Sequence, residues 1–522
     1  MTITMAKRGR LALLPLAAGL AAAFPAHAAW DFTPTAAARA TYSDNVGLQA
    51  DDRADSGMVL QLTPGFRLLN HSQHFDFSLD YSLNLYQYAG ARRNGEQRHN
   101  QNLDSQLKSR LVEDLLYLDA QAGIHQQATS AFGPLQAGND YVRTNRTEVR
   151  TYRLSPYLVH RFGAFANGQL RYSHDSVSTD NAGMRRSDGN TISAQLASGP
   201  TFRRFGWDAM ASRSVIDEQL PNLGGGERQQ STSSKAANLN LRYAATQQLN
   251  LGVYGGYDSY DFSSVGGAQS GAAYGASLQW TPSARTSVQA TAGHRFYGPS
   301  YSLALQHRSR GTVWNINYSD SVSSTRSQFV LPQAINTAAM LDNLFRAQIP
   351  DALLRAAVVQ AYIQSAGLPP TLANSVNFLS NRYSLNKQLN AGMAWQLART
   401  TTTVSVFKNK RQMLSSQQVD SVLLGSSLAT LNDNTEQVGA MASVSYRPGA
   451  QTVATLLGNA TNVKSLSDAR SSNHRDLRLN LSRTYSTRTT GTVELRHVRG
   501  STGLGGQQYT ENAVSATLTT SF

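Results

Sequence analysis

Apolar and polar residues alternate along much of the chain with a period of two, and few folds are compatible with this pattern. In HFDFSLDYSLNLYQY (74–88), one face would carry Phe75, Phe77, Leu79, Tyr81, Leu83 and Leu85. The other face would carry His74, Asp76, Ser78, Asp80, Ser82 and Asn84. Because successive side chains of a strand point to opposite sides of a sheet, this segment predicts a strand with one apolar face and one wet face.

The same alternation recurs in QVGAMASVSYR (437–447), RLNLS (478–482) and NLDSQLKSRL (102–111). The connections between such segments alternate in length. Short ones, such as 112–114, 161–164 and 203–206, separate long polar ones, such as 90–100, 127–145 and 177–189. We expect about 22 strands, within a range of about 18 to 24, and a long loop after each odd strand.

This pattern predicts an all-β fold: a transmembrane outer-membrane antiparallel β-barrel over residues 29–522. Such barrels combine short periplasmic turns with longer outer loops and strands of about 10 alternating residues. A soluble β-sandwich or solenoid is the alternative, but it would bury its apolar face and would not need loops of alternating length. The sheet is expected to close because lipid cannot satisfy an open strand edge.

Composition agrees with export to a membrane. Charged residues are only 15% of the chain and cysteine is absent, and the mean hydropathy is −0.36. The apolar stretch LALLPLAAGLAAAF follows Lys7, Arg8 and Arg10 and precedes the Ala26-His27-Ala28 pattern. This arrangement predicts a cleaved secretory signal over residues 1–28, with a buried N-terminal helix as the alternative. The expected location is the outer membrane of a Gram-negative bacterium.

One region, residues 331–372, interrupts the strand pattern. After Pro350 and Asp351, apolar residues recur at helical spacing, and Gly367 with Pro369-Pro370 would end the helix. A second helix is expected within 333–346. The insert would either cap an outer loop or enter the lumen as a plug, whose constriction candidates are Leu353, Leu354, Val358 and Tyr362.

The insert also carries a family resemblance. LPQAINTAAMLDNLF (331–345), IPDALLRAAVVQAYIQSAGLPPTL (349–372) and FLSNRYSLNKQL (378–389) resemble the most distinctive segment of a family of PEP-CTERM system-associated outer-membrane proteins. ATYSDNVGL (40–48) resembles the family's first strand and loop. The resemblance implies an outer-membrane barrel in bacteria with exosortase-type sorting and exopolysaccharide production. It implies no biochemical activity and no site residues.

The sequence offers no convincing catalytic or metal-binding pattern. HSQH (71–74) lies in an expected turn, the Gly-rich LGGGERQQ lacks a phosphate-binding Lys-Ser/Thr, and there is no G-x-S-x-G motif. We therefore expect no enzyme activity, no catalytic or metal residues and no cofactor. Export argues against a nucleic-acid partner.

Basic residues on expected inward faces are the remaining functional candidates: Lys108, Arg110, Arg242, Arg478 and Arg496. A lumen biased toward Lys and Arg would concentrate and pass anions. The alternative is that lumen arginines pair with Asp80, Asp104 and Asp119, while loop arginines such as Arg92, Arg93, Arg98, Arg185 and Arg186 bind lipopolysaccharide phosphates.

These observations favour a barrel that takes part in export or assembly of cell-surface exopolysaccharide, as a passive gated pore or guide with a polar, basic lumen. The alternative is a non-conducting structural or receptor-like barrel whose outer loops bind a surface polymer or protein, and an outer-membrane enzyme is a third reading. Expected partners are outer-membrane lipid, lipopolysaccharide, the barrel-assembly machinery, an anionic exopolysaccharide and periplasmic export components.

The segment SATLTTSF (515–522) is expected to be the last strand, with Leu518, Thr520 and Phe522 on its outward face. It should pair with the first strand, near Ala36 to Tyr42, to close the sheet. The family resemblance supports a role for Leu518, Thr520 and Phe522 as the signal that the assembly machinery reads.

Overall fold

The structure, a computed structural model, describes residues 30–90, 98–135, 138, 141–142, 144–179, 186–221, 227–262, 269–324, 337–346, 349–366, 368, 383–415, 434–468, 470–502 and 506–522. The signal expected over residues 1–28 lies outside this part of the chain. The described residues form one antiparallel sheet of 22 strands. This confirms the predicted all-β barrel and its strand number.

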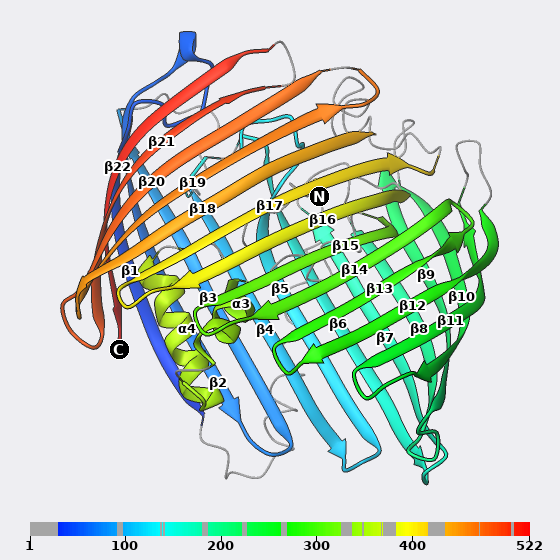
Figure 1. Cartoon of the computed structure of the whole chain (residues 1–522). Helices are drawn as coiled ribbons and strands as arrows, with labels where there is room; N and C mark the ends of the chain where they lie inside the picture. Colours follow the sequence, from blue (N-terminus) through cyan, green and yellow to red (C-terminus); the bar gives the residue numbers. More distant parts are fainter. Residues whose placement is uncertain are drawn as a thin grey trace, which may run out of the picture.

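The strands follow one another around the barrel in chain order (Figure 1). The first eleven are β1 (Asp31–Ser43), β2 (Gly57–His71), β3 (Phe75–Ala89), β4 (His99–Val112), β5 (Leu116–Ala128), β6 (Arg146–Phe162), β7 (Ala166–Thr179), β8 (Arg186–Ser198), β9 (Phe205–Pro221), β10 (Glu227–Ala244) and β11 (Leu249–Asp261). The others are β12 (Ser270–Ser283), β13 (Thr286–Arg295), β14 (Gly298–Arg308), β15 (Thr312–Ser324), β16 (Tyr383–Gln396), β17 (Thr400–Met413), β18 (Thr435–Gly449), β19 (Thr452–Ser465), β20 (Ser471–Thr484), β21 (Thr489–Ser501) and β22 (Gln508–Ser521).

The barrel closes where its first and last strands meet. β1 pairs with β22 from Thr35↔Ser521 to Ser43↔Ala513, and the backbone N–H of Phe522 donates to the carbonyl of Pro34 at 2.9 Å. The expected pairing near Ala36 to Tyr42 is therefore confirmed. Closure joins the two edges of the sheet, as a membrane-embedded sheet requires.

The outward face of the sheet is apolar and the inward face is polar. Leu477, Leu479 and Leu481 of β20 are 50%, 44% and 50% exposed, whereas Asn480 and Ser482 between and beside them are buried. Exposed aromatic residues lie toward both ends of the outward face. They are Phe205, Tyr243, Trp280, Trp314 and Trp395 near the short connections, and Tyr42, Tyr152, Tyr172, Tyr257, Tyr274 and Tyr301 nearer the long ones. An apolar band between two aromatic girdles is typical of an outer-membrane β-barrel.

The expected long loop after each odd strand is wrong between β13 and β14. β13 and β14 are joined by Phe296 and Tyr297 alone, because Arg295 already pairs with Gly298. Gly298 has a φ of 109°, a conformation that only glycine adopts readily. Elsewhere the strands continue into segments expected as loops: β7 and β8 reach Thr179 and Arg186, and β9 extends to Pro221.

In the described part of the chain, two helices lie between β15 and β16. They are α3 (Thr337–Phe345) and α4 (Ala352–Ala366), which confirms both expected helices of the 331–372 insert. A single 3-10 turn, η1 (Asp51–Arg53), lies in the connection between β1 and β2. Among the described residues, no helix has both the length and the apolar character needed to cross a membrane.

Candidate functional site: the lumen and the segments that fold into it

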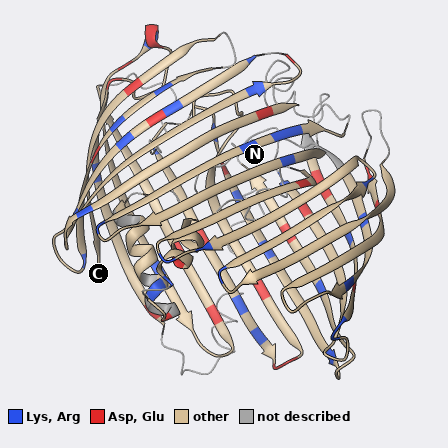
Figure 2. Ribbon diagram, in the orientation of Figure 1, with Lys and Arg blue, Asp and Glu red and all other residues tan. Residues whose placement is uncertain are grey.

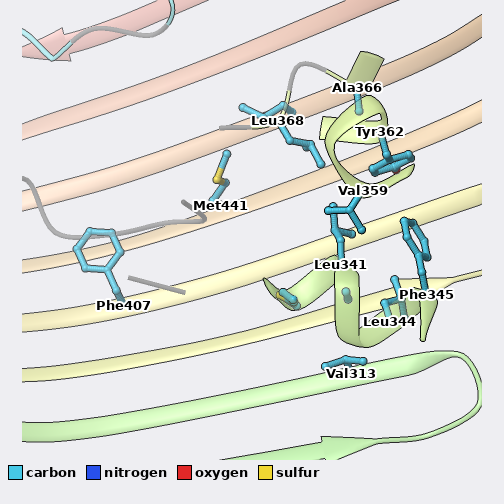
Figure 3. Packing of buried hydrophobic residues seen from close by; sticks show 13 residues of the cluster. Val313, Leu341, Leu344, Phe345, Val359, Tyr362, Ala366, Leu368, Phe407 and Met441 are labelled. Carbon is cyan, nitrogen blue, oxygen red and sulfur yellow. The ribbon is translucent and has the colours of Figure 1, made fainter. Parts of the chain in front are cut away.

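The helical insert lies inside the barrel rather than over its outer rim (Figure 1). Met340, Leu341 and Leu344 of α3 pack in one buried cluster with Val359, Tyr362 and Ala366 of α4. The same cluster includes inward-facing strand residues: Val313, Ala394, Phe407, Met441 and Leu457 (Figure 3). Because these five come from β15 to β19, the helices cover the inner wall of that part of the barrel.

The insert also reaches deep into the lumen. Val313 and Ala394 pair across β15 and β16, and both lie near the ends of these strands that carry the short connections. The chain leaves β15 and enters β16 at the opposite end, where Ser324 pairs with Tyr383. The helices therefore descend from the long-connection side toward the short-connection side. Of the two positions that the sequence left open, the lumen is the one observed.

Two of the four plug candidates, Val358 and Tyr362, lie in the helix cluster inside the barrel. Tyr362 is 2% exposed and Val358 packs against the edge of the cluster. Leu353 and Leu354 belong to α4, but their side chains lie outside the described part of the chain. Val359, a further buried residue of α4, is not among the candidates. The buried face of the helix begins with an arginine, so its apolar pattern is not evident from the sequence. The buried residues in the described part of the helix are Arg355, Val359, Tyr362 and Ala366.

Arg355 joins the two helices. Its side chain is 7% exposed, and its Nε lies 2.6 Å from Oδ1 of Asp342 in α3. Its Nη1 donates to the carbonyls of Ile349 (2.8 Å) and Pro350 (3.0 Å) in the segment between the helices. One guanidinium thus fixes both helices and their connection, so that the pair enters the lumen as a unit.

A second segment, the β5–β6 loop (129–145), also folds inward. Asn145, with a φ of 61°, accepts hydrogen bonds from Thr129 Oγ1 and from the backbone N–H of Ser130, which draws the two ends of the loop together. Tyr141 and Val142 are 3% exposed and pack with Val46, Leu48 and Tyr509. The loop therefore reaches from β5 and β6 over the inner wall to the seam between β1 and β22.

A buried ionic network anchors this loop. Arg496 and Glu511, both with side chains at 0% exposure, form an ion pair at 3.1 Å. Tyr141 Oη donates to Glu511 at 3.1 Å and accepts from Arg496 Nη2 at 2.9 Å. Glu494 bridges Arg496 (3.0 Å) and Arg39 (2.9 Å), and Arg39 Nη1 donates to the Gly138 carbonyl at 3.1 Å. The loop is thus tied to β1, β21 and β22 by charge-assisted hydrogen bonds.

Burial raises the pKa of Tyr141 above its usual value, and the neighbouring Glu511 carboxylate raises it further. The phenol therefore keeps its proton at neutral pH and can act as the donor to Glu511. A phenolate in this position would face a carboxylate in a site closed to water, which is unfavourable.

Next to this network lies a second polar cluster on β20. Asp476 accepts from Arg478 Nε at 3.1 Å and from Asn459 Nδ2 at 3.0 Å. His474 lies 3.4 Å from Asp476, and its Nδ1 is 3.1 Å from Tyr509 Oη. Every polar side chain in this cluster has a protein partner, so the cluster supports the wall rather than offering a free binding group.

The five basic lumen candidates all lie on inward faces, but they fall into two groups. Arg478 and Arg496 are paired with Asp476, Glu494 and Glu511, and they belong to the wall that the β5–β6 loop covers. Lys108, Arg110 and Arg242 are exposed to the lumen. No ion pair forms at these three within the described residues.

The alternative, that lumen arginines neutralise lumen acids, is confirmed for two of the three acids. Asp80 is 2.9 Å from Arg67, and Asp119 is 2.8 Å from Arg171. Asp104 instead lies 3.3 Å from His125. Figure 2 shows both signs of charge interspersed along the strands. Of the five basic candidates, Lys108, Arg110 and Arg242 are therefore the ones without an ion pair in the described part of the chain. Of the outer-loop arginines, Arg92, Arg93 and Arg185 lie outside the described residues, and Arg186 starts β8 and pairs with Asp188 at 2.8 Å.

The inner wall from β10 to β15 has a polar hollow of about 550 Å³. It is lined by inward side chains that carry hydroxyl, amide and guanidinium groups, among them Asn240, Arg242, Gln279, Gln289, Thr291 and Asn317. This wall lies outside the apolar cluster of the helices except at β15. Among the described residues, no group of three His, Asp or Glu side chains could hold a metal ion.

No protein-family model and no curated protein sequence matches the chain. Solved structures with a similar barrel include the FrpB iron transporter from Neisseria meningitidis, at 10% identity and a TM-score of 0.48, covering 94% of this chain and 83% of that one. The siderophore receptors PirA from Acinetobacter baumannii (8% identity, TM-score 0.47) and PirA from Pseudomonas aeruginosa (10%, 0.45) each match 94% of this chain and 80% of theirs. At such low identity the likeness carries no inference about what this chain binds.

Proposed function

We propose that this outer-membrane barrel is a gated conduit for an anionic polymer, in the export or assembly of cell-surface exopolysaccharide, and that it acts without enzymatic chemistry. The observation that carries the proposal is the helical insert, which is held in the lumen by one apolar cluster. The insert enters from a long connection, and its described contacts with the wall run from β15 to β20. A plug attached along one wall can swing or unfold without breaking the barrel.

The charge of the lumen supports an anionic cargo. Lys108 and Arg110 face the lumen on β4, and Arg242 lines the polar hollow on the opposite wall. None of these cations has a carboxylate partner within the described residues. Hydroxyl and amide side chains around Arg242 could exchange hydrogen bonds with a sugar polymer while it moves. The resemblance of 331–389 and 40–48 to exopolysaccharide-associated barrels points the same way.

A receptor-like barrel that does not conduct is the second candidate, and the β5–β6 loop favours it. The loop is tied to the inner wall at β21 and β22 by a fully buried ion pair, which is costly to separate. If the loop and the insert stay in place together, cargo cannot pass and the outer connections would bind a surface polymer or protein instead.

Replacing residues 331–372 by a short Gly-Ser linker separates these functions. Because Ser324 and Tyr383 are already paired, the shortened chain can close β15 and β16 as a hairpin. Reconstituted in planar bilayers, the shortened barrel should conduct severalfold more than the intact one and should admit bulky solutes. Unchanged conductance together with lost binding of a surface polymer would support the receptor.

The proposed preference for an anionic cargo is tested with a separate variant. Replacing Lys108, Arg110 and Arg242 together by Gln in the shortened barrel should shift its reversal potential away from anion selectivity. Replacing Arg67, which is paired with Asp80, is the matched control and should shift it less. A cation-selective channel before any substitution would contradict an anionic cargo.

A further inference from the structure

The outward wall carries two cations in an unfavourable arrangement. Arg213 of β9 and Lys235 of β10 are direct register partners, and both are exposed. They face outward, because their register alternates with that of the inward-facing Asp208 and Asn240 and continues that of Leu239 and Leu241, which are 48% and 52% exposed. Like charges directly opposite each other on neighbouring strands destabilise a sheet.

Among the described residues, no carboxylate relieves this pair. The register row runs Ile192, Arg213, Lys235 and Ser259 across β8 to β11, without an acidic residue. Asp217 and Asp261, the next outward acids along β9 and β11, form no ion pair with either cation, and Asp188 pairs with Arg186. The two positive charges therefore lack an anion in the part of the chain that the structure describes.

The height of the pair matches the lipid headgroups. Phe205 marks the aromatic girdle at the short-connection end of β9. Arg213 lies eight residues farther along, roughly 26 Å along the strand and about 20 Å along the membrane normal for a tilt of about 40°. Since the apolar band of such barrels is about 25 Å tall, the cations lie near its outer border. Ser231 and Ser233 of β10 follow beyond them.

An apolar hollow opens directly beneath the cations. Its volume is about 680 Å³, within the range of about 300–1,000 Å³ typical of ligand sites. Ala211 and Ala237, one outward position below Arg213 and Lys235, form its floor with Ala194, and Leu170, Leu196 and Leu239 form its sides. Small residues here leave a depression in a surface that carries Leu and Tyr elsewhere.

A paired cation above an apolar hollow on a lipid-facing wall fits one kind of ligand. We propose that Arg213, Lys235 and the hollow bind a phosphorylated glycolipid of the outer leaflet, the lipid A part of lipopolysaccharide. One phosphate lies between the guanidinium and the ammonium group, and an acyl chain fills the hollow. The long connections mark the outer side of the barrel, which places this site in the leaflet that contains lipid A.

The phosphate has a structural effect as well as a recognition role. Set between Arg213 and Lys235, it replaces cross-strand repulsion by two charge-assisted contacts. The lipid should therefore stabilise the β9–β10 hairpin, which extends beyond the membrane border. This role is independent of whether the lumen conducts.

Native mass spectrometry of the full barrel, stripped of lipid in mild detergent, tests the proposal. Titration with bisphosphorylated lipid A should give one retained lipid per barrel. The R213Q/K235Q double variant should bind about 30-fold more weakly, since each cation near a membrane anion contributes about one kcal/mol. A237F, which fills the hollow on a lipid-facing position, should weaken binding while leaving both charges in place.

The matched control is K408Q. Lys408 is an outward cation of β17 that is already paired with Glu436 at 3.3 Å, and its loss should leave lipid A binding unchanged. Resistance of each variant to SDS at room temperature verifies that the barrel is folded. Equal binding by wild type and R213Q/K235Q, equal binding of dephosphorylated lipid A, or a preference for phosphatidylglycerol would each overturn the proposal. None of these readouts depends on transport, so they stay separate from a failure of the conduit.

Discussion

The two segments that fold into the lumen are held in opposite ways. The helices α3 and α4 are docked by apolar side chains, with Leu341 and Ala366 both at 0% exposure. The β5–β6 loop is docked by a buried ion pair and a phenol, Arg496, Glu511 and Tyr141. Both segments leave the long-connection end of the barrel and cover neighbouring parts of its inner wall.

The difference bears on which segment can move. Apolar contacts are non-directional and their strength follows the buried area, so a helix pair can leave its wall and dock again in slightly different positions. A buried ion pair requires its geometry, and separating it leaves charges without partners. We infer that the insert is the moving part of the barrel and that the loop is a fixed brace at the seam between β1 and β22.

The absence of cysteine from the chain gives a direct way to compare the two segments. Ala131 in the loop and Ala366 in α4 are both 0% exposed. A single thiol introduced by A131C, the loop reporter, or by A366C, the insert reporter, shows by its rate of maleimide labelling how often that segment leaves its wall. With both reporters, each substitution below can be assigned to the brace, to the insert or to both.

The largest effect is expected from E511Q. The substitution removes one charge of a fully buried pair, which destabilises by about 3–5 kcal/mol. Because Glu494 still faces Arg496, we expect a loss at the lower end of this range. Labelling of the loop reporter should then rise about a hundredfold. Labelling of the insert reporter should not change.

The control for E511Q is D80N, which removes a carboxylate from the exposed pair of Asp80 and Arg67. Such pairs contribute little to stability, and neither reporter should respond. Equal acceleration at both reporters in E511Q would mean that loop and insert leave the lumen together, against a fixed brace.

The next largest effect is expected from L341A. A fully buried leucine replaced by alanine destabilises by about 2–5 kcal/mol, here the docking of α3 and α4. Labelling of the insert reporter should rise about 30-fold or more, and channel openings in planar bilayers should become more frequent, while the loop reporter stays protected. R346A, at an exposed position of the same helix pair, should leave both readouts unchanged. If labelling of the insert reporter rises but channel openings do not become more frequent, the docking of the helices does not control gating.

The contrast between the segments also explains what could be predicted from the sequence. The barrel, its strand number and its seam follow from local alternation, because each strand shows its outward face in its own residues. The helices could also be predicted from neighbouring residues, because apolar side chains such as Val358 and Tyr362 recur at helical spacing. The lumen position of the insert was open, because it depends on Val313, Phe407 and Leu457, which lie on three strands and resemble ordinary inward or small residues in isolation.

The position and contacts of the brace could not be predicted from the sequence, for the same reason. Arg496 is expected on an inward face, as a lumen cation or paired with Asp80, Asp104 or Asp119, but its partner Glu511 lies on the next strand and Tyr141 lies 355 residues away in the chain. No spacing in the sequence connects a phenol in a loop to an ion pair at the seam. The roles of Leu518, Thr520 and Phe522 in assembly stay predictions, although Leu518 and Phe522 are exposed as expected for outward residues.

A smaller effect is expected from Y141F, which removes the hydroxyl between Glu511 and Arg496. Loss of a buried hydrogen-bond partner costs about 1–3 kcal/mol, so labelling of the loop reporter should rise about tenfold. The effect should depend on pH. Since folding raises the pKa of Tyr141, its contribution is complete below the unfolded value of about 10 and is lost as pH rises through the higher folded value.

With Tyr141 intact, labelling of the loop reporter, corrected for thiolate formation with an exposed reference cysteine, should therefore stay flat to a pH of about 10 and increase only above it. Y141F should show no such increase. If the labelling rate with Tyr141 intact already increased at a pH of about 9, the phenol would not be kept protonated by burial and by Glu511, and the prediction would be wrong.

The smallest effect is expected from R355M, and it tests how purely apolar the docking of the insert is. Arg355 joins α4 to Asp342 at 2.6 Å and to the Ile349 and Pro350 carbonyls. Asp342 is 29% exposed and keeps its contact with Arg346 at 3.3 Å, and methionine preserves most of the packing, so the loss should be about 1 kcal/mol. Labelling of the insert reporter should then rise about fivefold. A rise as large as that of L341A would mean that charge holds the insert as it holds the loop, and the distinction between a moving plug and a fixed brace would fail.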